Sequence, residues 1–274
     1  CDQSNGVTMS QKIAVFEAGQ VALVTAGASG IGRCIAETLL AHECQVHVCD
    51  VSQSALDQFL LDNPQASGSL ADVSDPVQVQ GLFDDLASHY GKLNILVNNA
   101  GIAGPTARIE DIQVDEWDRT VSIDLNGQFY VTRLAVPLLK QNGGGSIINI
   151  SSNAALFGFP LRSPYTASKW AMIGLTKTWA MELGESNIRV NALCPGSVNG
   201  PRIESVISTE AQQRGMCPEN LRSVYQRQSS LRRFVDAQDV ADMALFLSSN
   251  MGATISGQAI GIDGHTEGLS NWLN

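Results

Sequence analysis

The feature that most constrains the fold of this chain is the alternation of short apolar runs with longer segments of helical character. The runs lack a strict apolar–polar alternation, which is typical of strands buried on both faces of a parallel sheet. Helix-length segments lie between them and would serve as crossover connections. The pattern predicts strands at Val21–Thr25, Gln45–Cys49, Leu93–Asn98, Ser146–Ile150 and Ile188–Leu193, a weaker strand at Ser69–Asp72 and a last one at Gln258–Ile262, with helices at Ile31–His42, Gln53–Asp62, Pro76–Tyr90, Val114–Gln141 and Pro164–Gly184.

These elements predict an α/β fold with a doubly wound, mostly parallel seven-stranded sheet and helices on both faces. The sequence shows no internal repeat, charge run or low-complexity linker, so residues 16–274 are expected to form one domain. Residues 1–15 are interpreted as an N-terminal extension. The polar, Arg-rich segment 197–231 interrupts the alternation, and long excursions of this kind usually form lids or binding loops.

Composition narrows the possible partners and compartments. The chain has 17 Lys and Arg against 27 Asp and Glu, a net charge of −10, which argues against binding to nucleic acid or anionic membranes. It contains no uncharged apolar stretch of the roughly 18 residues that a membrane helix needs, and the polar residues 1–10 lack the basic and apolar regions of a signal peptide. Its six cysteines and four histidines form no CxxC pair or metal-ligand cluster. We therefore expect a cytoplasmic protein with reduced thiols and no metal site.

A glycine-rich segment from Thr25 to Gly32 joins the first predicted strand to the first helix. Such a turn lets backbone N–H groups and the helix N-terminus approach a pyrophosphate. The second strand ends at Asp50, 20 residues after Gly30, where a carboxylate accepts hydrogen bonds from an adenosine ribose and repels a 2′-phosphate. The next residue, Val51, offers no basic partner for such a phosphate. The pattern favours a Rossmann-type NAD site over two alternatives, an empty glycine turn and a strand-end cap.

With these features in order, the chain resembles the short-chain dehydrogenase/reductase family in its single-domain form, from about Phe16 to Gly264. No motif is decisive alone, but the ordered set is specific. It comprises the glycine turn, Asp72-Val73, Asn98-Asn99-Ala100-Gly101, Ser152, Tyr165-Thr166-Ala167-Ser168-Lys169 and Pro195-Gly196.

The resemblance implies a set of cofactor contacts and an assembly. The family usually forms tetramers through the two long helices, so a homotetramer or a homodimer is expected. Two positions depart from the family pattern, because Ala26 stands where the turn usually has its first glycine and Gly200 where a threonine is usual. The implied cofactor-binding residues are Gly27, Ser29, Gly30, Ile31, Gly32, Asp50, Asp72, Val73, Asn99, Ala100, Gly101, Tyr165, Lys169, Pro195, Gly196 and Val198.

Three residues are candidates for the chemistry of an alcohol and its carbonyl. Tyr165 and Lys169 are four positions apart and share one face of a predicted helix. A phenol with a pKa of about 10 is a poor base at neutral pH unless a nearby ammonium stabilises the phenolate. Ser152 would stabilise charge on the substrate oxygen. The alternative is an ordinary buried tyrosine and a surface lysine.

The family resemblance adds a fourth position to this catalytic set, Asp124. Relatives usually carry an asparagine there, whose backbone carbonyl holds a water that leads from the lysine towards solvent. Here the stretch is Asp124-Leu125-Asn126-Gly127. If the carbonyl does the work, Asp124 replaces asparagine with little loss. An ionised carboxylate near Lys169 would instead offset the positive charge that Tyr165 needs. We therefore expect an active enzyme whose oxidation has a more alkaline optimum than that of an Asp124→Asn variant.

By position, Asn153, Arg162, Asn199 and Arg202 are expected to face the substrate together with Ser152 and Tyr165. Two arginines and two amides favour a polar or anionic substrate, whereas the alternative is that both arginines pair with surface acids. The sequence thus predicts an NAD-dependent oxidoreductase that interconverts a secondary alcohol, such as a polyol or a hydroxy acid, and its carbonyl. An NADPH-preferring carbonyl reductase and a non-catalytic dinucleotide-binding sensor or scaffold are the alternatives.

Overall fold

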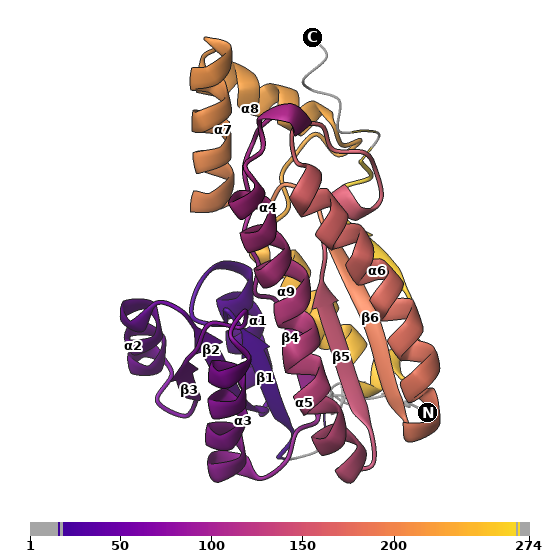
Figure 1. Ribbon diagram of the computed structural model, residues 1–274. Helices are drawn as coiled ribbons and strands as arrows, with labels where there is room; N and C mark the ends of the chain where they lie inside the picture. Colours follow the sequence, from indigo (N-terminus) through magenta and orange to yellow (C-terminus); the bar gives the residue numbers. More distant parts are fainter. Residues whose placement is uncertain (1–15, 17–18, 267, 269–274) are drawn as a thin grey trace, which may run out of the picture.

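The computed structural model describes residue 16, residues 19–266 and residue 268 (Figure 1). The expected N-terminal extension, residues 1–15, lies outside the described residues. Within the described part, seven parallel strands form one sheet in the order β3-β2-β1-β4-β5-β6-β7, which confirms the doubly wound fold. The strands are Val21–Thr25 (β1), Gln45–Asp50 (β2), Ser67–Leu70 (β3), Ile95–Asn98 (β4), Gly145–Ile150 (β5), Ile188–Pro195 (β6) and Ala259–Ile262 (β7).

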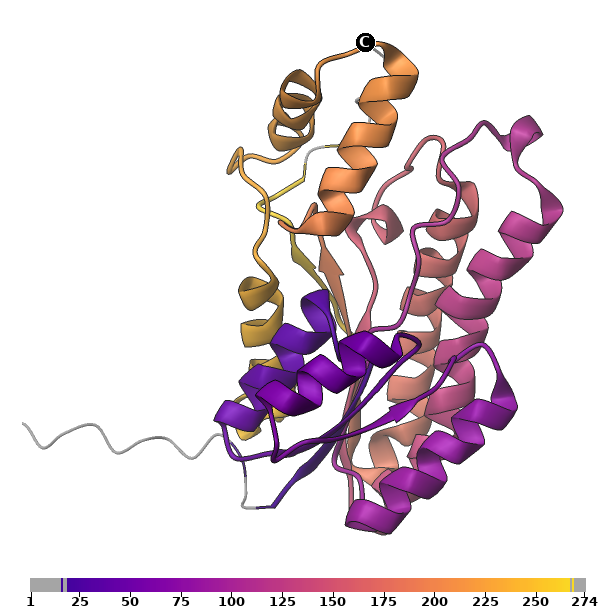
Figure 2. The ribbon, with the colours of Figure 1, turned by 90° about the vertical axis from the view of Figure 1, so that its left-hand side faces the viewer.

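Helices cover both faces of this sheet (Figures 1 and 2). Successive strand residues point to opposite faces, so Ala22 and Val24 join one apolar core and Val21 and Leu23 the other. The first core packs against α1, α2 and α9, and the second against α3, α5 and α6. The described helices are Gly30–Ala41 (α1), Gln53–Asp62 (α2), Pro76–Tyr90 (α3), Val114–Val121 (α4), Gly127–Gln141 (α5), Ser163–Leu183 (α6), Pro201–Arg214 (α7), Pro218–Arg227 (α8) and Ala237–Ser248 (α9).

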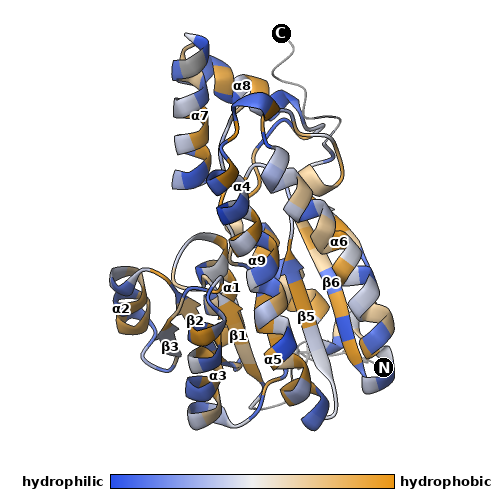
Figure 3. Ribbon diagram, viewed as in Figure 1, coloured by the Kyte–Doolittle hydropathy of each residue, from blue (hydrophilic) through white to orange (hydrophobic). Residues whose placement is uncertain are grey.

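Burial on both sides explains the composition of the strands, which are mostly apolar along their length (Figure 3). All five residues of β1 are buried, as are all four of β4. The surrounding helices bury one side and carry polar residues on the other, as a layered α/β fold requires. None of the described helices has the length and apolar composition needed to cross a bilayer.

The structure corrects three expectations. The third strand lies at Ser67–Leu70 because it pairs with β2 from His47 to Asp50, so the predicted range Ser69–Asp72 is wrong by two residues and Asp72 lies in the following turn. Helix α9 was not predicted, although the reciprocal capping of Asp236 and Asp239 marks its start. The expected helix from Val114 to Gln141 contains a π-helical turn at Ser122–Asn126.

The segment expected to form a lid or loop is largely helical, because α7 and α8 lie within it. The two helices sit beyond the ends of the strands, at the top of Figure 1. They share a separate apolar cluster with the segment that follows α8. Its buried members are Ile203, Ile207, Ala211, Leu221, Tyr225 and Phe234.

A buried polar network ties the edge strand β3 to its neighbours. His47 of β2 is fully buried, with Nδ1 2.7 Å from Ser67 Oγ and Nε2 2.9 Å from Ser69 Oγ. The Ser69 hydroxyl in turn donates to Asp85 Oδ2 at 2.8 Å. Burial, reinforced by the nearby His89 and opposed by Asp85, lowers the pKa of His47 from 6.5 to about 4.

This shift predicts a loss of stability in mild acid. Between pH 6.5 and 4 the unfolded chain protonates His47 while the folded chain does not, so the free energy of unfolding falls as pH decreases through this window. The expected contribution is about 3 kcal/mol. Denaturant unfolding at several pH values should show it in the wild type, and the His47→Gln variant should lack this part of the pH dependence. Equal pH dependence in wild type and His47→Gln would contradict the prediction, and His42→Gln, at an exposed histidine, is the control.

Candidate active site

The glycine turn between β1 and α1 is sharply bent. Ala26 has φ of 48° and Gly30 has φ of 53°, so an alanine occupies the left-handed region at the position where relatives have their first glycine. A Cβ on Gly32 would lie 2.2 Å from the Ala26 carbonyl oxygen, which shows how closely helix and turn pack. The space beside Gly30 is open, and the N-cap Ser29 makes no side-chain capping bond with α1. This arrangement suits an anion at a helix N-terminus and fits a dinucleotide pyrophosphate.

The end of β4 holds this turn in place. Asn99 Nδ2 donates to the carbonyl oxygens of Thr25 at 3.0 Å and Ala26 at 3.1 Å. The backbone N–H groups of Asn99 and Ala100 both donate to Thr25 Oγ1 at 2.9 Å. The candidate cofactor residues of the two loops therefore form one hydrogen-bonded unit.

The two candidate carboxylates for the adenosine side are Asp50, the last residue of β2, and Asp72, in the turn after β3. Asp50 is 7% exposed, and its carboxylate accepts the N–H of Ala28 at 3.3 Å and that of Ser52 at 3.1 Å. Asp72 accepts the N–H and the hydroxyl of Ser74 on Oδ1, at 2.8 and 2.7 Å. Val73 is buried beside Gly127 of α5, where a Cβ would meet it at 2.7 Å. Both carboxylates thus also stabilise their own turns.

Ser152 lies just after the end of β5, where it begins a short 3-10 turn, and Tyr165 and Lys169 lie on α6, near the carboxyl end of the sheet. Lys169 is 4% exposed; its Nζ donates to the Ile150 carbonyl at 3.2 Å and lies 5.6 Å from the centre of the Tyr165 ring. Ser152 Oγ accepts the N–H of Ala154 at 3.1 Å. Ser151, the other serine at this strand end, donates its hydroxyl to the Lys169 carbonyl at 3.0 Å and is thereby held against α6.

Asp124 is brought to the same place by the π-helical turn between α4 and α5. It is fully buried, and its Oδ1 accepts the N–H of Ile102 at 2.7 Å. Its Oδ2 lies 3.9 Å from Lys169 Nζ. Burial raises the pKa of Asp124, while Lys169, the Ile102 N–H and Arg202 act in the opposite direction. The departure from the family pattern therefore places a titratable group beside Lys169.

The four candidate substrate residues do not all face the same place in the structure. Arg162 is 6% exposed and donates to the Ala103 carbonyl at 3.3 Å, and the Arg202 guanidinium lies 6.0 Å from the Tyr165 ring centre. Asn153 donates to Thr266 Oγ1 at 3.1 Å, and the exposed Asn199 donates to Asp236 Oδ1 at 2.7 Å. Asn153 Oδ1 also accepts the Ser152 hydroxyl at 3.4 Å. The two arginines thus lie near Tyr165 and Asn153 lies beside Ser152, whereas Asn199 bonds to another part of the chain.

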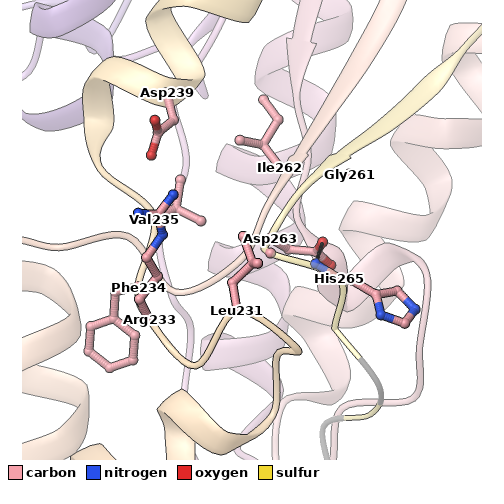
Figure 4. A pocket seen from close by; sticks show the side chains of 10 residues that line it. Leu231, Arg233, Phe234, Val235, Asp239, Gly261, Ile262, Asp263 and His265 are labelled. Carbon is pink, nitrogen blue, oxygen red and sulfur yellow. Dashed lines mark hydrogen bonds between the residues drawn. The ribbon is translucent and has the colours of Figure 1, made fainter.

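The segment after β6 packs against the end of β7. The Gly196 N–H donates to the Ile262 carbonyl at 3.0 Å, and a Cβ on Gly196 would lie 2.9 Å from Asp263 Cβ. Pro195 is the last residue of β6, and Val198 pairs with Val235. Beside this segment lies a hollow of about 250 Å³ (Figure 4). Its polar lining includes Arg233, Asp239, Asp263 and His265.

Sequence reasoning missed this hollow and an acidic group on α7. Glu210 is 7% exposed, accepts the Tyr225 hydroxyl at 2.6 Å and pairs with Arg214 at 3.0 Å. Burial lowers the pKa of Arg162, and attraction to Tyr225, Tyr165 and Glu210 opposes this change, so Glu210 acts electrostatically on the substrate region. Arg162, at the start of α6, and Glu210, on α7, are far apart in the sequence, and only the fold brings them together. No local sequence pattern therefore predicts this pair.

The chain is similar to known proteins over most of its length. Residues 25–266 match a family model described as enoyl-(acyl carrier protein) reductase. The chain is 38% identical over 259 residues to trans-4-hydroxycyclohexanecarboxylate dehydrogenase of Sinomonas cyclohexanicum, covering 90% of this chain and 92% of that protein. The chain belongs to the short-chain dehydrogenase/reductase family and is an oxidoreductase.

Two solved structures are also similar. NAD⁺-bound xylitol dehydrogenase matches with a TM-score of 0.85 and 27% identity, covering 89% of this chain and 98% of that one. A variant of actinorhodin polyketide ketoreductase with NADPH matches with a TM-score of 0.86 and 30% identity, covering 90% and 96%. These two relatives carry different nicotinamide cofactors, so similarity of fold does not decide between them.

Proposed function

We propose that this protein is an NAD-dependent dehydrogenase that oxidises the secondary alcohol of a hydroxy carboxylate and reduces the corresponding ketone. The observation that carries this proposal is the buried Lys169 ammonium beside Tyr165, at the strand end that bears Ser152. An ammonium at this distance from the ring places a positive charge beside the side chain that would accept the proton. Tyr165 then accepts the proton of the alcohol, and Ser152 donates a hydrogen bond to the substrate oxygen.

The glycine turn, the Asn99–Ala100 segment and Asp50 would hold the cofactor. When bound, NAD supplies the hydride acceptor for the oxidation. Asp50 favours NAD because its carboxylate would lie next to the 2′ position of the adenosine ribose, where it accepts hydroxyl groups and repels a phosphate. Its neighbour Val51 is exposed and carries no charge.

The environment of Arg162 is the reason for proposing a substrate that carries a carboxylate. Among the described residues, one hydrogen bond of its guanidinium is accounted for, the bond to Ala103, although the residue is only 6% exposed. A buried cation is costly unless its donors and its charge are matched. Arg202 adds a second positive charge near Tyr165. The name of the relative from Sinomonas cyclohexanicum describes a hydroxy carboxylate substrate, which supports the same class here.

A substrate panel with one matched pair of variants tests this proposal. Hydroxy carboxylates, polyols and neutral alcohols are compared by NADH absorbance. Arg162→Gln is expected to raise KM for the best hydroxy carboxylate by about 30-fold or more, since removing one partner of a buried charge pair costs about 2–5 kcal/mol. KM for a neutral analogue should change little. Arg119→Gln, an exposed arginine on α4, is the control. An equal effect on charged and neutral substrates would contradict recognition of a carboxylate.

A further inference from the structure

Two adjacent polar residues directly after α8 carry buried atoms that are not hydrogen-bonded. Gln228 Nε2 and Ser229 Oγ are both shielded from solvent, and neither has a hydrogen-bond partner among the described residues. Ser229 as a whole is only 6% exposed. A buried donor or acceptor without a partner costs free energy, so such groups in a native protein indicate a use other than stability.

Gln228 and Ser229 line one small hollow, which lies beside the catalytic residues. Asn153 and Tyr225 line it as well. Asn153 Oδ1 accepts the Ser152 hydroxyl at 3.4 Å, so one wall of the hollow is bonded to the residue that would hold the substrate oxygen. Burial lowers the pKa of Arg162, and the strongest opposing attraction comes from Tyr225, which places another wall near the proposed carboxylate site.

The size and the charges of this hollow fit one uncharged oxygen. Its volume is about 10 Å³, which is about the space that a single water-sized oxygen needs and is too small for a carboxylate. Arg233 and Asp263 bring one positive and one negative charge to its lining, so the hollow favours no ion of either sign. The Gln228 amide nitrogen only donates, whereas the Ser229 hydroxyl both donates and accepts. Together they match a hydroxyl group, which accepts one hydrogen bond and donates another.

We propose that Gln228 and Ser229 bind a second hydroxyl group of the substrate, so that the preferred substrate is a dihydroxy carboxylate. This inference rests on the proposed dehydrogenase function. In this arrangement Arg162 holds the carboxylate, Ser152 and Tyr165 hold the reacting carbinol, and the hollow takes the hydroxyl of a nearby carbon. A substrate without that hydroxyl leaves both buried atoms unpaired, and a site built to bond a hydroxyl strongly rejects the analogue that lacks it.

Matched pairs of acids test this subsite. Lactate is compared with glycerate, and 3-hydroxybutyrate with 3,4-dihydroxybutyrate, because the members of each pair differ by one hydroxyl group. For the better pair, wild-type kcat/KM from NADH absorbance should be at least about tenfold higher for the dihydroxy acid. Gln228→Met and Ser229→Ala should each lower this ratio towards one. Ser223→Ala is the control and should keep the ratio, since this exposed serine of α8 donates to the Glu219 carbonyl and lies outside the lining.

Binding of the same acids to the protein saturated with NADH separates the subsite from the dehydrogenase function, because a reduced cofactor cannot oxidise them. Calorimetric Kd values should show the same preference for the dihydroxy acid in the wild type and its loss in Gln228→Met and Ser229→Ala. If this preference is found but NAD oxidises none of the acids, the dehydrogenase function is contradicted and the subsite is retained. If the preference is absent from the wild type, or survives in both variants, the subsite is overturned whether or not the acids are oxidised.

Unfolding in denaturant tests the unpaired state of the two atoms without any ligand. Gln228→Met and Ser229→Ala lose no internal hydrogen bond, so their free energy of unfolding should equal or exceed that of the wild type. Ser69→Ala is the control, because the buried Ser69 hydroxyl bonds to His47 and Asp85 and its removal should lower the free energy of unfolding. A clear loss of stability in both Gln228→Met and Ser229→Ala would show that the two side chains are bonded within the protein and would overturn the proposal.

Discussion

The Tyr165→Phe variant is expected to lose at least about 100-fold in kcat/KM for alcohol oxidation, because a positioned general base typically contributes 10²–10⁴-fold. The change removes the proton-accepting oxygen and keeps the ring that packs near Lys169 and Arg202. Steady-state NADH formation with the best substrate measures the loss. NADH binding, followed by fluorescence, should change much less than the rate.

Tyr90→Phe is the matched control for this prediction. Tyr90 is also partly buried, and its hydroxyl accepts a hydrogen bond from Ser67 Oγ at 2.9 Å, but it belongs to the network beneath β3. Removing its hydroxyl should leave kcat/KM within a few-fold of the wild type. A loss of less than about tenfold in Tyr165→Phe would show that another group accepts the proton.

The fold was predictable because its signals are local. Residues Val21–Thr25 form a strand with the predicted bounds, since five consecutive buried residues leave a clear apolar run. The third strand, Ser67–Leu70, has small and polar residues at a sheet edge, and its position depends on pairing with β2. Helix α9 had a local signal, the capping pair Asp236 and Asp239, that the strand–helix alternation did not use.

The candidate site was only partly predictable. Motif spacing brought Tyr165 and Lys169 together because both lie on one helix. The contact of Lys169 with Asp124 joins α6 to the π-helical turn, and the electrostatic pairing of Arg162 with Glu210 joins α6 to α7. Such contacts depend on how the helices pack, which no spacing within one segment specifies. Asn199 shows the same limit, since its amide bonds to Asp236.

Wild-type protein is expected to prefer NAD over NADP by at least about tenfold in kcat/KM, which corresponds to roughly 1.4 kcal/mol and is within reach of one unfavourable charge contact. The Asp50 carboxylate is the source of this expected preference. Both of its oxygens accept backbone N–H groups, from Ala28 and Ser52, which hold the charge at the end of β2. A 2′-phosphate placed there would meet a fixed negative charge with no nearby basic residue in the sequence, since Val51 follows.

Two variants test this expected preference for NAD. Asp50→Asn removes the negative charge and keeps one hydrogen-bond acceptor for the turn, whereas Asp50→Ala removes both the charge and the acceptor. Each should bring the two cofactors closer in kcat/KM, mainly through a lower KM for NADP. Asp57→Asn is the matched control: it removes one exposed negative charge from α2, so it reports the effect of net charge alone. Equal efficiency of the wild type with both cofactors would contradict the prediction. A preference that survives in both Asp50 variants would assign the discrimination to another part of the adenosine site.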